Sequence, residues 1–217
     1  MPDPVSSPLP ALRQLLRERF PSAAHCRAEP LRTGVPGIDG PLGGLPRPAL
    51  TELVCSAPSC GGQLLIGQLL DVTRTAASRV ALVDANDAFD PASWPAASLE
   101  HLIWVRVHDA AEAMAAADLL ARDANFALLV VDLRRSPLAQ LRRIPATSWY
   151  RLQRALEPTT LATAVLTPCP LVPSAQVRLE LGTSHALADL AAERPALHTQ
   201  LSPAVRRQRT GDLAATG

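Results

Sequence analysis

The chain has 217 residues, 47% hydrophobic and 3% aromatic, and its 21 basic and 20 acidic residues give a net charge of +1. This composition excludes a wholly disordered chain, and the lack of an 18-residue apolar run argues against a membrane protein. The near-neutral charge argues against a protein that coats nucleic acid by bulk electrostatics. All basic residues are arginine, so chemistry that needs a lysine ammonium is excluded.

The start of the chain and its cysteines indicate the compartment. Residues 1–10 lack the basic and apolar regions of a signal peptide, so we expect a cytoplasmic protein. His25 beside Cys26 lacks the ligand spacing of a zinc site, and no C-x-x-C pair occurs. We therefore expect no metal and four reduced thiols. The four are Cys26, Cys55, Cys60 and Cys169.

Hydrophobic periodicity predicts the elements in chain order. Residues 11–20 have apolar residues at helical spacing and predict an amphipathic helix, followed by a linker at 21–32 and a turn-rich stretch at 33–48. Strands are predicted at 50–55, 79–84, 101–106, 126–132, 161–167 and 175–181. Helices are predicted at 63–75, at 109–122 with Asp109 as its cap, at 148–156 with Ser148 as its cap, and near 185–193.

The alternation of strands and helices predicts an α/β domain with a mainly parallel sheet. The strand FALLVVD (126–132) is apolar on both faces, as a sheet flanked by helices on both faces requires. We divide the chain into a leader with its amphipathic helix at 1–32, a core domain at 33–181 and a flexible tail at 182–217.

The loop after the first core strand is where a phosphate would bind, since ligands bind at the carboxyl ends of parallel strands. The P-loop template G-x-x-x-x-G-K-[ST] aligns here with Ser56, Gly61, Gly62 and Gln63, so only its second glycine is kept. Gly62 lacks the ammonium that neutralises phosphate charge, and the Gln63 amide replaces the hydroxyl that ligates Mg²⁺. The glycine turn and the helix N-terminus still favour an anion, although a plain strand-to-helix loop explains them equally well.

Four segments resemble the RecA core in their order and spacing. They are LRTGVPGIDGPLGGLPRPALTELVCSAPSCGG (31–62), LVDANDAFDP (82–91), FALLVVD (126–132) and QVRLEL (176–181). The resemblance covers about residues 31–181 and implies a RecA-like core. It also implies that Asp132 takes the place of the Walker B carboxylate and Asn86 the place of the acidic residue that activates water in RecA.

The ImuA family, RecA-like accessory proteins of mutagenic DNA repair, resembles the chain more closely still. The resemblance rests on DAFDPASWPAASLEHLIWVR (87–106), and on FALLVVDLR (126–134) followed by LRRIPATSWYRLQRA (141–155). It implies a role in damage-induced (SOS) translesion synthesis. The partners that it implies are an ImuB-like Y-family protein and a DnaE-type error-prone polymerase, with RecA as a further one.

Departures from the RecA pattern predict a domain without catalysis. The amide of Asn86 cannot accept a proton at neutral pH, so it cannot replace the base. Together with Gly62 and Gln63, this predicts a pseudo-ATPase that needs no cofactor. Asp132 keeps its carboxylate, either to orient a metal or as a helix cap or loop anchor.

Charge is unevenly distributed along the core. Residues 134–154 hold six arginines and no acid, whereas residues 84–123 hold eight acids and two arginines. The six are Arg134, Arg135, Arg142, Arg143, Arg151 and Arg154. Three interpretations stay open for this basic stretch, which lies where RecA's first DNA-contacting loop would fall: a dock for a protein partner (including a second copy), a grip on DNA phosphates, or a solvated surface. Trp149 and Tyr150 within it are expected to be core residues.

The sequence thus predicts a non-catalytic adaptor of translesion synthesis. One alternative is a nucleotide-hydrolysing RecA paralogue, which the missing lysine disfavours. Another is a cell-division inhibitor similar to SulA, which the DAFDP segment (87–91) disfavours. ATP-gated filaments are not expected, whereas a homo-oligomer such as a dimer, or a heteromer, stays open.

Overall fold

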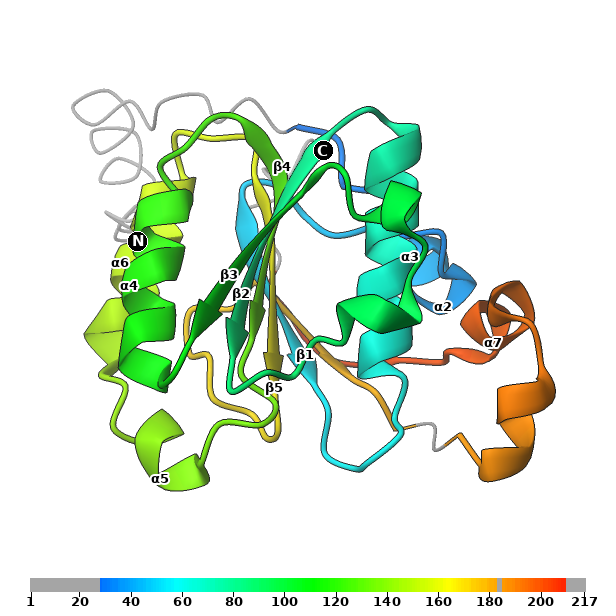
Figure 1. Cartoon of the computed structure of the whole chain (residues 1–217). Helices are drawn as coiled ribbons and strands as arrows, with labels where there is room; N and C mark the ends of the chain where they lie inside the picture. Colours follow the sequence, from blue (N-terminus) through cyan, green and yellow to red (C-terminus); the bar gives the residue numbers. More distant parts are fainter. Residues whose placement is uncertain (1–27, 183–184, 210–217) are drawn as a thin grey trace, which may run out of the picture.

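The predicted apolar strands pair into one sheet. The computed structural model describes residues 28–182 and 185–209. Seven strands lie in the order β3-β2-β4-β5-β1-β6-β7 (Figure 1). All neighbouring pairs are parallel except β6 and β7, which are antiparallel. The protein is therefore an α/β protein with a mainly parallel sheet, as predicted, and this architecture is consistent with a RecA-like core.

The six predicted strands are all observed, with their ends within two residues of the prediction, whereas β7 was not predicted. The strands are β1 (Ala49–Val54), β2 (Arg79–Ala85), β3 (Leu102–Val107), β4 (Phe126–Asp132), β5 (Ala162–Thr167), β6 (Val177–Glu180) and β7 (Ala204–Gln208). The α-helices are α2 (Pro36–Leu42), α3 (Gly62–Thr75), α4 (Ala110–Leu120), α5 (Leu138–Leu141), α6 (Ala146–Leu156) and α7 (Arg194–Gln200). The 3-10 helices are η1 (Pro91–Ser93), η2 (Ala96–Ser98) and η3 (Leu187–Ala191). The predicted helix at 11–20 lies outside the described residues.

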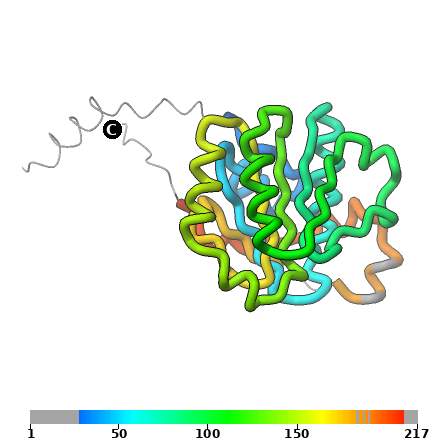
Figure 2. The backbone as a smooth tube through the Cα atoms, turned by 60° about the vertical axis from the view of Figure 1, so that its left-hand side comes forward, coloured from blue at the N-terminus to red at the C-terminus, as the bar shows by residue number. Residues whose placement is uncertain are grey.

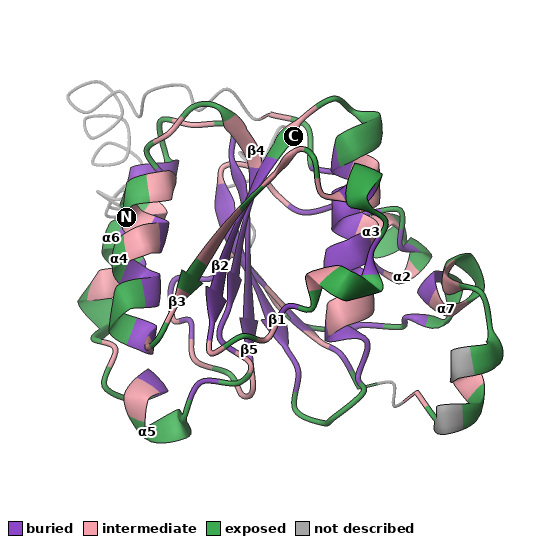
Figure 3. Ribbon diagram, in the orientation of Figure 1, coloured by how far each residue is buried: buried purple, intermediate pink, exposed green. Residues whose placement is uncertain are grey.

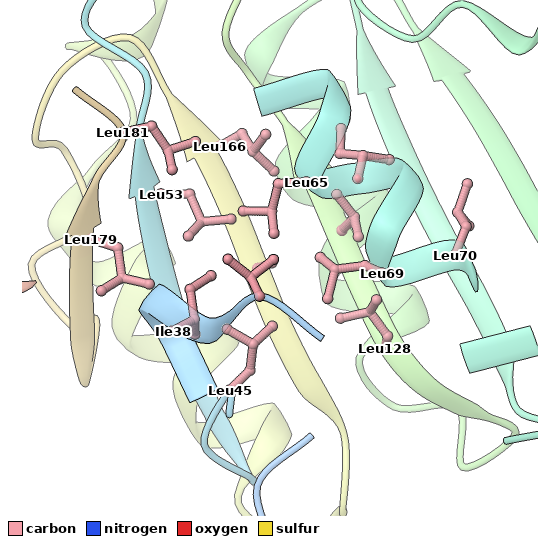
Figure 4. Packing of buried hydrophobic residues seen from close by; sticks show 14 of the residues in the cluster. Ile38, Leu45, Leu53, Leu65, Leu69, Leu70, Leu128, Leu166, Leu179 and Leu181 are labelled. Carbon is pink, nitrogen blue, oxygen red and sulfur yellow. The ribbon is translucent and has the colours of Figure 1, made fainter. Parts of the chain in front are cut away.

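Helices cover both faces of the sheet, and its central strands are buried between them (Figures 1, 2 and 3). On one face, leucines of α3 pack with leucines of β1, β4 and β5, and Ile38 of α2 joins the same cluster (Figure 4). On the other face, Trp149 and Leu152 of α6 pack with Leu129 and Val131 of β4 and with residues of α4. Each fully buried leucine contributes about 1.5–3 kcal/mol, so these two layers are the main source of stability.

Residues 36–42 form α2, where a turn-rich stretch was predicted. Pro36 suits the first turn of a helix, and Gly43 ends it at φ 74°. The Asp39 carboxylate accepts hydrogen bonds from the backbone N–H groups of Thr33 and Gly34, at 2.9 Å each. This side-chain anchor stabilises a seven-residue helix that apolar periodicity does not signal.

The prediction of a flexible tail at 182–217 is wrong for much of its length. The helix α7 packs against α3 with His198 buried, and β7 pairs with β6 at the edge of the sheet. The folded part of the chain therefore extends beyond residue 181, to at least Gln208. The reason for the error is that β7 is an edge strand of mostly exposed residues, so it lacks the alternation of a half-buried strand.

The two predicted helix caps have different outcomes. The Asp109 carboxylate accepts from the backbone N–H groups of Ala111 and Glu112, both at 2.8 Å, which confirms it as the cap of α4. Ser148 is not a cap, because α6 begins at Ala146 after Pro145, and no side chain caps it. Proline before the first turn sets the extended entry to the helix instead.

Strand register places the loop after β1 and the end of β4 at the same edge of the sheet. Val54 pairs with Thr167 of β5, and Asp132 pairs with Leu166 on the other side of that strand. The segments that follow β1 and β4 therefore start level with each other, one strand apart. No helix among the described residues is long and apolar enough to span a membrane.

Candidate functional site

The loop between β1 and α3 borders a pocket of about 560 Å³. Residues 56–59 are exposed, whereas Cys60, Gly61 and Gly62 are buried. Gly61 precedes α3 with φ 89°, a left-handed conformation that glycine adopts without strain. The four residues predicted from the P-loop template come together here as expected, and they line the pocket. They are Ser56, Gly61, Gly62 and Gln63.

Arg134 lies where a side chain at position 62 would extend. A Cβ atom added to Gly62 would lie 2.6 Å from Nη1 of Arg134 and 3.0 Å from Sγ of Cys55. The distance to Nη1 is too short for non-bonded atoms and the distance to Sγ is tight, so a side chain at residue 62 would displace the guanidinium from this position. A cation from the end of β4 thus lies beside the loop, at the position where the template has its lysine.

Asp132 is fully buried and pairs with Arg134. Nε of Arg134 donates to Oδ1 at 2.9 Å and to Oδ2 at 3.1 Å, and Nη2 donates to Oδ2 at 2.5 Å. The backbone N–H of Arg134 also donates to Oδ1, at 3.1 Å. Burial lowers the pKa of Arg134, but the hydrogen bonds and charge of Asp132 outweigh burial and raise it. Asp132 is therefore the anchor of this turn, one of the two roles expected from the sequence.

Gln63 completes the contact between the two segments. Its Oε1 accepts from Nη2 of Arg134 at 3.2 Å, while its Nε2 is buried without a hydrogen-bond partner among the described residues. The amide is thus oriented by Arg134. At this position the chain has an amide in place of the hydroxyl that would ligate a metal.

Asn86 does not belong to this pocket, although the sequence grouped it with the loop. It has φ 66°, and its Nδ2 donates to Oγ of Ser136 at 3.1 Å. Together with Arg106 and His108, it lines a separate hollow at the end of β2 and β3. The residues that RecA combines are therefore divided between two places.

The residues present do not fit Mg²⁺ and ATP as a P-loop does. The lysine position is glycine, the hydroxyl position is an amide, and both oxygens of the one retained carboxylate bind Arg134. A metal bound by Asp132 would have to displace a charged, hydrogen-bonded guanidinium from a buried site, which is costly. Among the residues that the structure describes, no group of three or more His, Cys, Asp or Glu side chains is placed to hold a metal ion.

Two cysteines, Cys55 and Cys60, also line the pocket, and the sequence did not single them out. They stand at the end of β1 and just before α3, and each perturbs the pKa of the other. Their presence at both ends of one short loop was the available signal, but their separation by four residues matches no common cysteine motif.

The six arginines of the basic stretch do not share one face. Arg134 is turned inward, and Nη1 of Arg135 donates to the backbone oxygen of Asp87 at 2.9 Å. Nε of Arg151 lies 3.4 Å from Oδ1 of Asp118 in α4. The three that remain are exposed: Arg142, Arg143 and Arg154. Part of the acidic stretch thus neutralises part of the basic stretch within the same molecule.

A groove of about 420 Å³ lies between α4 and the segment of α5 and α6. Its lining includes the apolar side chains of Met114 and Ile144, with Arg143 and Arg151 among the charged residues. Oε1 of Gln140 lines it as well and is buried without a partner in the described chain. Nearby on α6, Trp149 is a core residue as predicted, whereas Tyr150 is 47% exposed, which corrects the prediction that it is buried.

Neither a scan against models of protein families nor a search of curated proteins finds a match to this chain.

Proposed function

We propose that this chain is a cytoplasmic RecA-like adaptor without ATPase activity, which docks a polymerase-like protein in damage-induced translesion synthesis. The similarity of residues 87–155 to the ImuA family suggests the pathway and the partners: an ImuB-like Y-family protein and a DnaE-type error-prone polymerase. The α/β architecture is compatible with that similarity. The loss of nucleotide chemistry is supported separately, by the loop itself.

The observation that carries the proposal is the buried ion pair of Asp132 and Arg134 beside Gly62. In a P-loop protein, lysine and magnesium supply positive charge to the phosphates. Here Arg134, the cation beside the lysine position, is already neutralised by the carboxylate that would hold the metal. The charges of Arg134 and Asp132 thus cancel, so Arg134 has little positive charge available to stabilise a transferring phosphoryl group.

We expect the purified chain to release no phosphate from ATP above a buffer control, with Mg²⁺ present and with or without single-stranded DNA. A phosphate-release assay measures this. Hydrolysis that is lost in an Asp132→Asn and Arg134→Gln double variant, but kept in an Arg142→Gln control, would contradict the proposal. That result would favour the RecA-paralogue ATPase instead.

The surface that suits the docking role is the groove between α4 and α6. Its floor is apolar and its rim carries arginines, a combination suited to an acidic segment of the partner with apolar anchor residues. Gln140 adds an unpaired buried acceptor for a backbone N–H of that segment. A protein partner is favoured over DNA, because Arg134, Arg135 and Arg151 are already engaged within the chain.

We expect Arg143→Glu combined with Arg151→Glu to weaken binding of the polymerase-like partner about tenfold, by reversing the charge of the two arginines that line the groove. Binding is measured by calorimetry with the purified partner. The matched control is Arg74→Glu with Arg79→Glu, a reversal of two exposed charges on other elements. Equal losses in both variants would contradict the assignment of the groove.

The same preparation separates the other interpretations. Binding to single-stranded DNA that the groove variant abolishes would assign the arginines to phosphates. Self-association that the variant abolishes would assign them to a second copy. Copurification of the division tubulin, with no polymerase-like protein, would support the inhibitor similar to SulA and overturn the adaptor.

A further inference from the structure

Two thiols lie at the two ends of the loop that the P-loop template identified, and both line its pocket. Cys55 ends the β1 side and is 9% exposed, and Cys60 precedes the N-terminus of α3 and is 4% exposed. Both line the 560 Å³ pocket, so small molecules reach them through it. Sγ of Cys55 lies 3.0 Å from the position that a Cβ of residue 62 would take, next to Nη1 of Arg134. The thiols and the guanidinium therefore form one cluster.

The pKa values of the two thiols shift in opposite directions. The hydrogen bond from the Cys55 thiol lowers the pKa of Cys60 to about 6, helped by the Gly62 N–H and by the charge of Arg134, although burial opposes the change. The same hydrogen bond and burial raise the pKa of Cys55. Cys60 is thus the thiol that ionises first, and Cys55 is the one that keeps its proton. A thiolate is the form that attacks oxidants.

We propose that Cys55 and Cys60 form a redox-active pair, in which a peroxide oxidises Cys60 and Cys55 then closes a disulfide across the loop. This site is independent of the adaptor function, since it requires neither a partner nor DNA. In this proposal, the loop that resembles a degenerate phosphate loop carries thiol oxidation as its chemistry.

The steps balance in atoms and electrons. The Cys60 thiolate attacks one peroxide oxygen, an S–O bond forms, the O–O bond breaks, and the leaving oxyanion takes a proton from water. Cys60 becomes a sulfenic acid and the peroxide is reduced to water or an alcohol. The Cys55 sulfur then attacks the Cys60 sulfur, the S–S bond forms, the S–O bond breaks, and the departing hydroxide takes the Cys55 proton to become water. A dithiol reverses the reaction by exchange.

The loop has room for the closure. A disulfide needs the two sulfurs about 2.05 Å apart, so a hydrogen-bonded pair has to approach further. Residues 56–59 between the cysteines are exposed, and Gly61 allows the backbone to turn beside them. Closure also removes the thiolate charge next to Arg134, so the pocket becomes more positive. Oxidation thus changes both the shape and the charge of the loop.

The test uses the full chain with Cys26→Ser and Cys169→Ser, which leaves only the two loop cysteines. After treatment with hydrogen peroxide, we expect neither cysteine to react with an alkylating reagent, because both are in the disulfide. The intact chain should lose two hydrogen atoms in mass and remain a monomer on a non-reducing gel. Dithiothreitol should restore both thiols. This measurement needs no variant of the site itself.

Two further variants assign the roles. We expect Cys55→Ser to accumulate a sulfenic acid at Cys60 that dimedone traps, and Cys60→Ser to lose the reaction. Alkylation of Cys60 should titrate with a midpoint at about pH 6, whereas an ordinary thiol titrates near 9.0. Thiols that survive peroxide, a disulfide between molecules instead of within one, or equal oxidation of both serine variants would overturn the proposal.

Discussion

At the scale of single residues, the lack of a side chain at residue 62 determines where Arg134 lies. Gly62 leaves the space that the guanidinium of Arg134 occupies, since any Cβ there would lie 2.6 Å from Nη1. Arg134 in turn satisfies both oxygens of Asp132, which is fully buried. A buried carboxylate is tolerated only when paired, so these three residues depend on one another. The absence of a side chain at residue 62 and the burial of the Asp132 carboxylate are thus parts of one arrangement.

This dependence predicts the effect of Arg134→Gln on stability. The substitution leaves the Asp132 charge buried without its partner, and we expect the free energy of unfolding to fall by about 3–5 kcal/mol. Denaturant unfolding followed by circular dichroism measures it. Adding Asp132→Asn removes the unpaired charge, so the double variant should recover a substantial part of the loss.

The control for this pair is the exposed ion pair of Arg106 and Asp87, with Nε to Oδ1 at 2.7 Å. Its removal by Arg106→Gln should leave the denaturant midpoint of unfolding nearly unchanged, because solvent screens an exposed pair. Additive losses in the Arg134 and Asp132 double variant would show that the two side chains do not act as a pair.

At the scale of elements, α3 makes an unusually close contact with the connection from β2 to β3. Gly67 lies in the middle of α3, and a Cβ there would lie 1.5 Å from Cη2 of Trp94, which is 8% exposed. The Arg194 guanidinium stacks over the Trp94 ring, 4.0 Å from its centre. One indole thus joins α3, the 86–101 segment and the start of α7.

Gly67→Ala should therefore destabilise the protein, although alanine is normally the better helix former by about 1 kcal/mol. The added methyl collides with a buried ring, and overpacking of this kind costs about 1–3 kcal/mol. Gly40→Ala in α2 is the matched control, because nothing lies within 4 Å of its Cβ position. Thermal unfolding compares the two, and a higher melting temperature for Gly67→Ala would refute the packing described.

Another element-level link is the fully buried Glu52 of β1. Its Oε1 accepts from the backbone N–H of Val172 at 3.0 Å and from Oγ1 of Thr167 at 3.2 Å, and its Oε2 accepts from Nε of Arg178 at 2.5 Å. One carboxylate therefore connects β1, β5, β6 and the segment before β6. An acid inside an otherwise apolar strand serves structure here, since its oxygens face protein donors rather than the pocket.

For the molecule as a whole, the sheet extends past the limits of the predicted core. The C-terminal strand β7 covers the edge of β6, and Arg209 N–H donates to the Gln176 oxygen at 2.8 Å beside it. Val177 and Leu179 of β6 are buried. Without β7, the backbone groups of β6 would form an open edge, and open edges promote pairing between molecules.

We expect a chain that ends at Pro203 to unfold at lower denaturant concentration and to associate as its concentration rises, compared with a chain that ends at Arg209. Analytical ultracentrifugation and denaturant unfolding measure the two effects. In the longer chain, Arg206→Ala should have little effect, because the ion pair with Glu180 is largely exposed. If the shorter chain stays monomeric and keeps its unfolding midpoint, β7 is not needed to protect the sheet.

Local sequence determined most of the architecture. Apolar runs such as 126–132 have no polar face to expose, so they must lie inside a sheet covered by helices, and their alternation with helices requires parallel pairing. The loop after β1 was equally visible, because template positions and strand order define its place. Whether a segment is buried on one face or on both can be predicted from its own residues.

Contacts between distant segments were decided only by the tertiary structure. Arg134 looked like a surface cation in a basic stretch, yet it lies 71 positions from the Gln63 that it contacts and points inward. Asn86 looked like part of the loop, but a left-handed backbone directs it to Ser136. The strand β7 has no alternation of its own and forms because β6 offers it an edge. In each case, the partner that stabilises the residue lies far away in the chain, and only folding brings the two together.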